Sequence, residues 1–491
     1  MDEQSQQRRR KLDRLREAGV NPYANDFTPR DLTAQVHAAY AEKDAQALEG
    51  VEQRHCLAGR ITALRSFGKA AFFALQDRSG KLQVFVQKER LDEASFAIFK
   101  QCVEVGDIVG VVGRPMRTRT GELSILAEQL RLLTKALRPL PEKWHGLRDV
   151  EIRYRRRYLD LIANPEVRRV FELRARAIRF LRDFLDQRGF LEVETPMMSV
   201  LAGGATARPF VTHHNALDLN LFMRVAPELY LKRLLVGGLE RVYELNRCFR
   251  NEGISTQHNP EFTMLEFYQA YATYTDLMEL SEQMLCGLVS DLLGSSRLSC
   301  QGRPIELRPP FRRVSVHAAL AAALDVDEER LWDEREVGRL AAQRSVELPP
   351  DWGLGKRVMA LFEALVEPEL LEPTFVCDFP LEISPLSRKK EGRGDLVDRF
   401  ELYIAGREVA NAFSELNDPD DQRQRFEQQM REKAAGDEEA MPFDEDYILA
   451  LEHGMPPAAG EGIGIDRLVM LVAEAASIRD VILFPLLRPE A

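Results

Sequence analysis

Residues 247–252 read Arg-Cys-Phe-Arg-Asn-Glu, and residues 257–268 read Gln-His-Asn-Pro-Glu-Phe-Thr-Met-Leu-Glu-Phe-Tyr. Two further segments stand out in the same half of the chain. Residues 189–198 read Gly-Phe-Leu-Glu-Val-Glu-Thr-Pro-Met-Met, and residues 460–471 read Gly-Glu-Gly-Ile-Gly-Ile-Asp-Arg-Leu-Val-Met-Leu. An amphipathic pattern over 167–188 predicts a long helix, and the glycine that follows predicts its end before a short strand. These segments indicate a large region of mixed helix and strand.

The chain changes character in front of this region. Between residues 51 and 137, short alternating apolar segments predict five strands, and a helical pattern falls between the third and the fourth. This order matches an OB barrel, whose sheet face commonly binds single-stranded nucleic acid, although other small barrels share the pattern. The expected domains are a polar helical arm (1–50), an OB-fold domain (51–137), a proline-containing linker (138–155) and a large domain (156–491).

Length and composition place the chain among globular proteins of two or three domains. It has 491 residues, of which 45% are hydrophobic and 30% are charged. No apolar run approaches 18 residues, so no membrane-spanning helix is expected, and the charged N-terminus lacks the apolar run of a secretory signal. The six cysteines form no Cys-x-x-Cys pair. We therefore expect reduced thiols in a cytoplasmic protein without structural zinc.

The net charge of −11 is unevenly distributed along the chain. Residues 50–135 carry 14 basic and 9 acidic side chains, and residues 136–157 carry 7 and 3. Residues 1–157 thus sum to about +8, and the rest of the chain to about −19. A basic front half suggests a part that faces phosphate, and an acidic back half suggests a part that faces a cation. For any single cluster, solvated surface charge is the favoured explanation.

The quoted segments resemble motifs one, two and three of the class II aminoacyl-tRNA synthetases, and most closely those of the lysyl-tRNA synthetases. The resemblance covers nearly the whole chain and is strongest at 226–232, 247–268, 413–418 and 460–471. It implies an α+β protein with an N-terminal five-stranded OB-fold β-barrel and a C-terminal class II antiparallel β-sheet flanked by helices. It also implies activation of L-lysine with ATP, transfer of the lysyl group to the 3′ end of tRNA(Lys), and a homodimer built on the first motif.

Activation brings an amino-acid carboxylate against the α-phosphate of ATP, so cationic side chains must neutralise two anions. A guanidinium offers a planar pair of donors to phosphate or carboxylate, which makes Arg250 and Arg467 the candidate catalytic clamps. By resemblance, Arg250 contacts the α-phosphate and the substrate carboxylate, and Arg467 contacts the γ-phosphate. The resemblance places four further residues around the nucleotide: Phe262 stacked on adenine, with Glu252, His258 and Asn259.

Magnesium prefers oxygen ligands and usually takes one or two carboxylates together with substrate phosphates. The resemblance assigns Mg²⁺ to Glu401 and Glu408, and Glu401 also borders ATP. Without the resemblance, two glutamates seven residues apart on a hairpin would indicate only a polar surface.

Three glutamates lie in apolar contexts where a bare carboxylate is costly: Glu228, Glu266 and Glu415. An acidic lining suits a substrate with two ammonium groups and repels aspartate. By resemblance, Glu266, Tyr268 and Glu415 surround the side-chain ammonium of lysine. Glu228 and the backbone near Gly204 take the α-amino group, and Asn411 supports the carboxylate. Helix capping or pairing with arginine would explain any one of these glutamates alone.

In the OB domain, Phe72 and Gln83 are the candidate anticodon-binding residues, since an exposed aromatic ring stacks on a base and an amide reads a base edge. The resemblance gives the same two positions. Strand alternation requires that either Phe72 or Phe73 faces the core.

Two positions depart from the family pattern. Glu461 replaces a usually apolar residue of the third motif, and we expect its carboxylate to point away from the triphosphate. Ala410 and Ala412 flank Asn411 where relatives often carry glycine, and we expect their methyl groups to narrow the pocket.

Three alternatives stay open. An aspartyl- or asparaginyl-tRNA synthetase shares the three motifs and the OB barrel, but it needs a basic or amide-rich pocket. An enzyme that lysylates a protein is a second alternative, although such relatives lack the OB half. A non-catalytic RNA-binding paralogue is the third. A nucleophilic triad and a P-loop ATPase are not indicated, because neither Gly-x-Ser-x-Gly nor Gly-x-x-x-x-Gly-Lys-[Ser/Thr] occurs.

Overall fold

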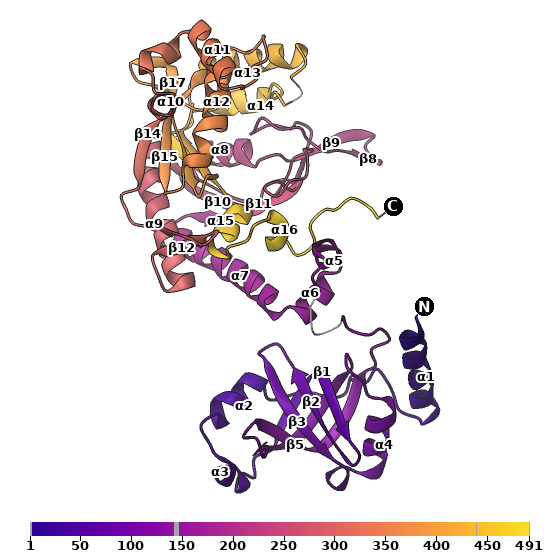
Figure 1. The fold of residues 1–491 in the computed structure, drawn as a ribbon. Helices are drawn as coiled ribbons and strands as arrows, with labels where there is room; N and C mark the ends of the chain where they lie inside the picture. Colours follow the sequence, from indigo (N-terminus) through magenta and orange to yellow (C-terminus); the bar gives the residue numbers. More distant parts are fainter. Residues whose placement is uncertain (1, 142–146, 438, 491) are drawn as a thin grey trace. The chain divides into compact units, whose positions relative to one another are not determined.

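The computed structural model describes residues 2–141, 147–437 and 439–490. The chain folds into two compact units, Met1–Arg148 and Asp149–Ala491 (Figure 1). The predicted linker over 138–155 contains residues 142–146, which lie outside the described residues, and its last part forms helix α5 (Val150–Arg155).

The N-terminal unit is built on a closed five-stranded barrel with the strand order β1-β2-β3-β5-β4. Helix α4 (Glu93–Cys102) follows the third strand. The predicted OB barrel is therefore confirmed. The strands are β1 (His55–Phe67), β2 (Ala70–Gln76), β3 (Lys81–Gln87), β4 (Ile108–Arg117) and β5 (Leu123–Thr134).

Period-two burial explains why these segments form a barrel rather than helices. In β3, Leu82, Val84 and Val86 are buried, whereas the residues between them are partly exposed. The same core takes up side chains from the three helices of the N-terminal arm. These helices are α1 (Glu3–Glu17), α2 (Thr33–Tyr40) and α3 (Ala45–Glu49).

The C-terminal unit contains one large sheet with the order β14-β15-β17-β18-β19-β11-β10-β6, and β16 pairs with β17. The neighbours pair antiparallel except at the two ends, where β14–β15 and β10–β6 are parallel. The predicted antiparallel sheet is thereby confirmed. Its strands are β6 (Leu191–Glu192), β10 (Arg241–Phe249), β11 (Glu261–Ala270), β14 (Arg312–Ser315), β15 (Thr374–Pro380), β16 (Lys389–Lys390), β17 (Arg393–Ile404), β18 (Arg407–Ser414) and β19 (Ala458–Gly464).

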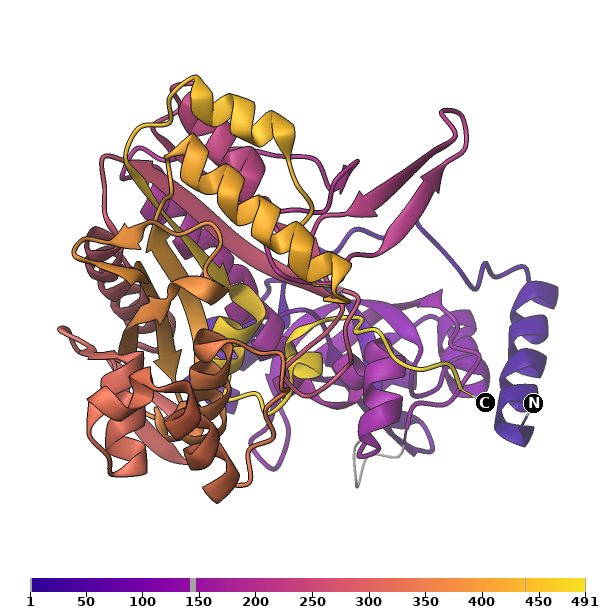
Figure 2. The ribbon, with the colours of Figure 1, turned by 90° about the horizontal axis from the view of Figure 1, so that it is seen from above.

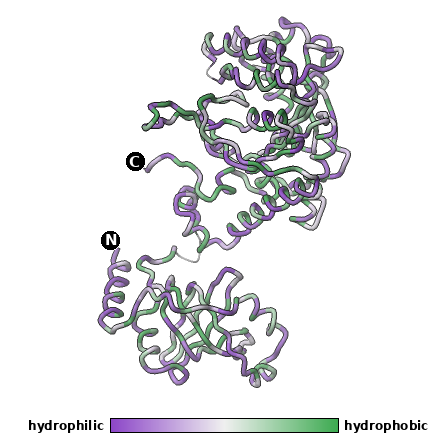
Figure 3. Tube along the Cα trace, turned by 180° about the vertical axis from the view of Figure 1, so that it is seen from behind, coloured by the Kyte–Doolittle hydropathy of each residue, from purple (hydrophilic) through white to green (hydrophobic). Residues whose placement is uncertain are grey.

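Helices cover the two faces of this sheet in different ways. One face packs against α7 (Pro165–Asp186), α9 (Tyr274–Leu293) and α15 (Ile465–Val472) around the largest apolar core. On the other face, α8 (Glu228–Val236), α13 (Pro419–Ala434) and α14 (Glu445–Glu452) cover one part (Figure 2). The part of that face which these three helices leave uncovered can hold a binding site. Hydrophobic segments concentrate along the central strands of each unit (Figure 3).

The remaining elements lie around the sheet. Strands β7 (Met198–Ser199), β8 (Val211–His214) and β9 (Leu219–Met223) form a small sheet, and the β8–β9 hairpin extends from the unit (Figures 1 and 2). Helices α10 (Val316–Leu324), α11 (Glu334–Gln343) and α12 (Leu354–Leu365) share a separate apolar core. Within the described ranges, no helix is long and apolar enough to cross a membrane. The other short elements are α6 (Arg157–Ala163), α16 (Ile478–Val481), β12 (Arg297–Cys300) and β13 (Arg303–Glu306).

Candidate active site

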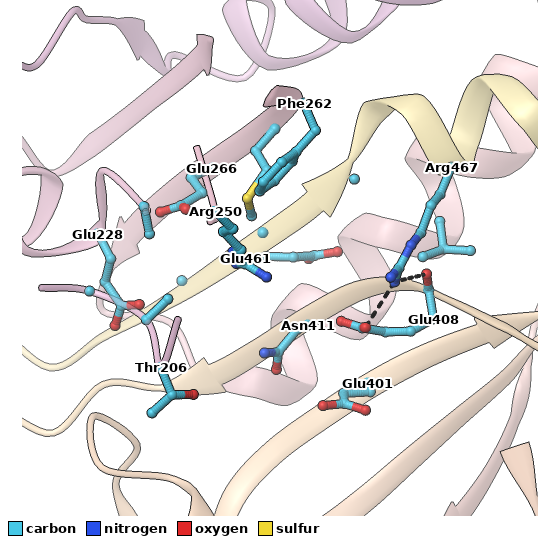
Figure 4. A pocket seen from close by; sticks show the side chains of 18 of the residues that line it. Thr206, Glu228, Arg250, Phe262, Glu266, Glu401, Glu408, Asn411, Glu461 and Arg467 are labelled. Atoms are coloured by element: carbon cyan, nitrogen blue, oxygen red, sulfur yellow. Dashed lines mark hydrogen bonds and ion pairs between the residues drawn. The ribbon is translucent and has the colours of Figure 1, made fainter. Parts of the chain in front are cut away.

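A cavity of about 370 Å³ lies on the open face of the large sheet. Paired strands place one row of residues across its floor. Glu266 of β11 pairs with Gly462 of β19, Gly462 pairs with Asn411 of β18, and Asn411 pairs with Glu401 of β17. Residues paired in register share a sheet face, and Figure 4 shows three of these side chains on the cavity side. The antiparallel register thus gathers residues that are far apart in the sequence.

A buried carboxylate cluster forms one end of the site. Glu228, Glu266 and Glu415 are 8%, 4% and 1% exposed. Lys232 lies one turn after Glu228 on α8 and places its Nζ 2.6 Å from Glu228 Oε1. The same ammonium forms an ion pair with Glu415. Three carboxylates and one ammonium therefore share one buried volume.

The electrostatics of this cluster favour an additional cation. Burial, together with the nearby charge of Glu228, raises the pKa of Glu266 to about 8. Burial also raises the pKa of Glu415 to about 8, although Lys232 acts in the opposite direction. The Tyr268 hydroxyl donates to Glu266 at 3.0 Å. Burial makes the ionised form of each carboxyl group costly, and a cation beside it would offset part of that cost.

Two glycines make room for this cluster. A Cβ at Gly460 would lie 2.2 Å from the Tyr268 ring and 2.5 Å from Glu415 Oε1, so a side chain at this position would displace both residues. Gly204 has a φ of +94°, and a Cβ there would lie 3.3 Å from Glu228 Cβ. The backbone therefore approaches the carboxylates closely at two points.

Cationic and aromatic groups form the other end of the cavity. The guanidinium of Arg250 lies 5.1 Å from the ring centroid of Phe262. Its Nε–H is buried and donates no hydrogen bond to any described residue, and Arg250 borders the cavity. Arg467 donates to the Glu408 carboxylate at 3.0 Å, and its second nitrogen lies 3.2 Å from His258 Nε2. An anion entering this end would meet two guanidinium groups.

The other predicted nucleotide residues line the same end. Burial lowers the pKa of His258, and the positive charge of Arg467 lowers it further, so the neutral imidazole is favoured. The Asn259 amide donates to the Glu261 carbonyl at 2.6 Å, and Glu252 is exposed to solvent. All of the residues predicted for ATP and lysine border this one cavity except Glu415, which lies behind Gly460.

The candidate metal ligands lie on the paired strands β17 and β18. Glu401 is buried and accepts hydrogen bonds from Arg399 at 2.5 Å and from Tyr403 at 2.6 Å. Burial raises the pKa of Glu401, and Glu408 is among the causes. In the described ranges, no group of three or more histidine, cysteine, aspartate or glutamate side chains is arranged to hold a metal ion. Further oxygen ligands for a metal ion at Glu401 and Glu408 would be water molecules or substrate oxygens.

Residues 383–387 also line the cavity. Arg425 of α13 donates to the carbonyl groups of Ser384 and Ser387 at 2.9 and 3.0 Å. Gln422 of the same helix donates to the carbonyl between them at 3.1 Å. An isolated bridge between Ser387 and Glu415 and these side chains of α13 together hold the backbone of this segment.

Comparison with known proteins agrees with this geometry. Residues 149–488 match the family described as tRNA synthetases class II (D, K and N), and residues 55–133 match the OB-fold nucleic acid binding domain. A protein of Thioalkalivibrio sulfidiphilus named lysine–tRNA ligase is 54% identical over 486 residues, which are 99% of this chain and 97% of that protein. The chain belongs to the lysine–tRNA ligase family of class II tRNA synthetases. Proteins of the same name from Moorella thermoacetica and Idiomarina loihiensis are 54% and 52% identical, covering 98% and 100% of this chain and 96% and 98% of those proteins.

Family resemblance assigned no role to Lys232, Arg399 or Arg425, which the structure brings to the site. Lys232 follows Glu228 by four residues, and this spacing on a helix signals an ion pair that sequence alone can detect. Arg399 donates to Asn411 at 3.0 Å as well as to Glu401. No sequence signal links Arg425 to the cavity, because its partners precede it by about forty residues.

The expectation that Ala410 and Ala412 narrow the pocket is wrong. Both methyl groups are buried in the core on the opposite face of the sheet. Strand alternation explains the error, since Asn411 between them occupies the cavity face.

The orientation expected for Glu461 is confirmed. Glu461 is 1% exposed and pairs in register with Phe267 and Ala412, which pack in the core. The hydroxyl of Ser281 on α9 lies 2.7 and 2.6 Å from its two carboxylate oxygens. The carboxylate therefore points away from the cavity.

A separate aromatic face lies on the barrel of the N-terminal unit. Phe73 is buried in the barrel core, whereas Phe72 faces outward and stacks on Phe85 with ring centroids 4.3 Å apart. Phe67, which is 61% exposed, packs against Phe72 edge to face. Gln83 of the neighbouring strand accepts a hydrogen bond from Ser124 and donates to Glu122. Sequence reasoning identified Phe72 but did not identify Phe85 as its partner.

Proposed function

We propose that this protein activates L-lysine with ATP and transfers the lysyl group to the 3′ end of tRNA(Lys). The observation that carries this proposal is one cavity with an acidic end, lined by Glu228 and Glu266 and backed by the buried Glu415, and a cationic end, Arg250 and Arg467. The acidic end suits a diamine, and the cationic end suits a triphosphate. Relatives named lysine–tRNA ligase, alike over nearly the whole chain, support the same substrate.

In the proposed first step, a carboxylate oxygen of lysine attacks the α-phosphorus of ATP. A P–O bond to lysine forms while the bond to the pyrophosphate oxygen breaks, giving lysyl-adenylate and pyrophosphate. Arg250 stabilises the charge that develops, because its unpartnered Nε and its neighbouring nitrogens border the cavity. Asn411 orients the carboxylate from the sheet floor, and no side chain forms a covalent bond.

The substrate ends are held by different groups. Glu266, Tyr268 and Glu415 receive the side-chain ammonium, and Glu228 with the backbone at Gly204 receives the α-ammonium. Phe262 provides a face for adenine, and Arg467 holds the γ-phosphate after exchanging its contact with Glu408. His258, Asn259 and Glu252 complete the nucleotide end.

Magnesium is proposed at Glu401 and Glu408. Hard carboxylate oxygens fit this cation, and the surrounding charge supports the assignment. Burial, together with the charges of Glu408 and Glu401, raises the pKa of the nearby Glu367 to about 7, which agrees with an excess of negative charge there. When bound, Mg²⁺ would neutralise phosphate charge; the protein residues only hold and orient it there.

In the second step, a hydroxyl of the tRNA 3′-terminal adenosine attacks the lysyl carbonyl, and AMP leaves.

We propose that Phe72 and Gln83 contact the anticodon, with Phe85 extending the aromatic platform. We also propose that the protein is cytoplasmic and forms a homodimer.

The test is pyrophosphate exchange with each of the twenty amino acids, followed by tRNA charging with the best substrate. We expect exchange with lysine. Exchange with aspartate or asparagine instead would contradict the proposal, and tRNA binding without any exchange would indicate a non-catalytic paralogue. Arg250→Ala should lower kcat by at least about a hundredfold. Arg303→Ala, a surface change in β13, is the matched control.

A further inference from the structure

Lys232 lies wholly buried among the carboxylates of the cavity. Its side chain is 0% exposed, and its Nζ contacts Glu228 at 2.6 Å, pairs with Glu415 and lies 5.2 Å from the centroid of the Phe413 ring. Burial acts to lower the pKa of Lys232, but Glu228 and Glu415 raise it above the ordinary value. Lys232 is therefore a fixed positive charge inside the site.

Neighbouring charged groups have partners of their own. The hydroxyls of Tyr268 on β11 and Tyr447 on α14 face the carboxylates, and burial raises the pKa of both, so they remain neutral. The Cys248 thiol of β10 also stays neutral, because burial raises its pKa to about 12. The nearby ion pairs are Arg224 with Glu244, Arg399 with Glu401, and Arg233 with Asp444.

A count of formal charges then describes the cluster. Three ionised carboxylates and one ammonium leave two negative charges in excess. Apart from its ion pair with Lys232, Glu415 accepts no hydrogen bond from any described residue. Carboxylates this close together in a poorly solvated volume do not all ionise at once, so an empty cavity retains protons.

We propose that Lys232 is a specificity-determining residue: its fixed charge leaves the cavity two negative charges in excess, and L-lysine balances both while displacing protons that the carboxyl groups hold beforehand. This inference rests on the proposed function. Each displaced proton leaves a carboxyl O–H and passes to the buffer, and no bond between heavier atoms changes. Lysine contributes two ammonium groups, and its carboxylate is matched separately by Arg250.

The same count of formal charges explains why the cavity would reject other amino acids. A substrate with an uncharged side chain contributes a single ammonium, so one carboxyl group keeps its proton and forms no ion pair with the substrate. Aspartate adds a further negative charge. The pKa values of about 8 for Glu266 and Glu415 agree with protons that are held at neutral pH and lost when a cation arrives.

Isothermal titration of L-lysine into the full-length protein near pH 7 tests the inference, without ATP. Phosphate and Tris buffers differ in ionisation enthalpy, so the difference in observed heat gives the number of protons exchanged. We expect release of about one to two protons per lysine bound, from two carboxyl groups that titrate near pH 8. Lysine binding without proton release would overturn the inference and leave the proposed function standing. Absence of lysine binding would overturn both.

Variants isolate the contribution of Lys232. Lys232→Met keeps the apolar length but removes the charge, so Glu228 and Glu415 hold their protons to higher pH. The lysine KM should fall as pH rises from about 6 to 8 in the wild type, and this profile should move up by at least about one pH unit in the variant, with little change in the ATP KM. Lys356→Met, which also removes a lysine paired with two carboxylates, is the matched control. An unshifted profile in Lys232→Met would contradict the role.

Discussion

Replacing Glu461 by glutamine is expected to stabilise the C-terminal unit at alkaline pH and to leave it nearly unchanged at acid pH. Glu461 is 1% exposed, and its carboxylate contacts the hydroxyl of Ser281. That hydroxyl also lies 2.7 Å from the Leu277 carbonyl, and it carries a single hydrogen. If the hydrogen goes to Leu277, the short contact with Glu461 requires a proton on the glutamate. Glutamine reproduces this neutral form because its amide donates in the same place.

The magnitude follows from the pKa of the buried group. Burial raises the pKa of Glu461 from 4.5 to about 8, although the Ser281 hydrogen bond acts in the opposite direction. Between these values the folded state holds a proton that the unfolded state has lost, so the free energy of unfolding falls as pH rises. Below about pH 4.5 the effect is absent, and above about pH 8 it is complete. A shift of this size corresponds to at most about 5 kcal/mol, since each pKa unit is worth about 1.4 kcal/mol.

Denaturant unfolding of the wild type and Glu461→Gln at about pH 5 and pH 8.5 measures the effect. We expect nearly equal midpoints at the lower pH and a higher midpoint for the variant at the higher pH. Glu279→Gln, on the solvent side of the same helix α9 that carries Ser281, is the control and should change neither midpoint. Equal stability of Glu461→Gln and the wild type at both pH values would refute the reasoning.

The remaining predictions concern other parts of the molecule. Arg425→Met removes the donor to two carbonyls of the cavity wall and should raise the lysine KM about tenfold in steady-state pyrophosphate exchange. Arg431→Met, on the exposed side of α13, is the control and should leave the lysine KM unchanged. Phe85→Ala removes half of an aromatic stack and should raise the tRNA KM about tenfold or more without affecting lysine-dependent exchange. Lys135→Met leaves the fully buried Asp107 without its ion-pair partner and should destabilise the N-terminal unit by about 3–5 kcal/mol in thermal unfolding; an unchanged transition would contradict this estimate.

Much of the architecture could be predicted from the sequence because patterns within short segments determine it. The alternation in β3 and the glycine after α7 are properties of short segments, so the barrel strands and the long helix were predicted close to their observed positions. Motif residues such as Arg250 and Glu266 were recognisable because the chemistry of two opposed anions and a diamine restricts the residue types. Their roles on substrates stay predictions.

Other features depended on register and long-range contacts. The alanines beside Asn411 were assigned to the wrong face, although alternation around a correctly placed Asn411 would have placed them in the core. Phe85 was missed because its stacking partner Phe72 lies on the neighbouring strand. Arg425 was missed because nothing near it in the chain indicates a contact with Ser384.

The sequence by itself determined which residue types are available: three glutamates in apolar contexts, two arginines in glycine- or asparagine-containing motifs, and a barrel in front of them. Only the tertiary structure decided how these groups are charged. Ionisation depends on the solvent and on the charges within a few ångströms, and here separate elements, α8, β11 and the end of β18, supply them. The contacts of Lys232 with both Glu228 and Glu415 are therefore a property of the fold and not of any one segment.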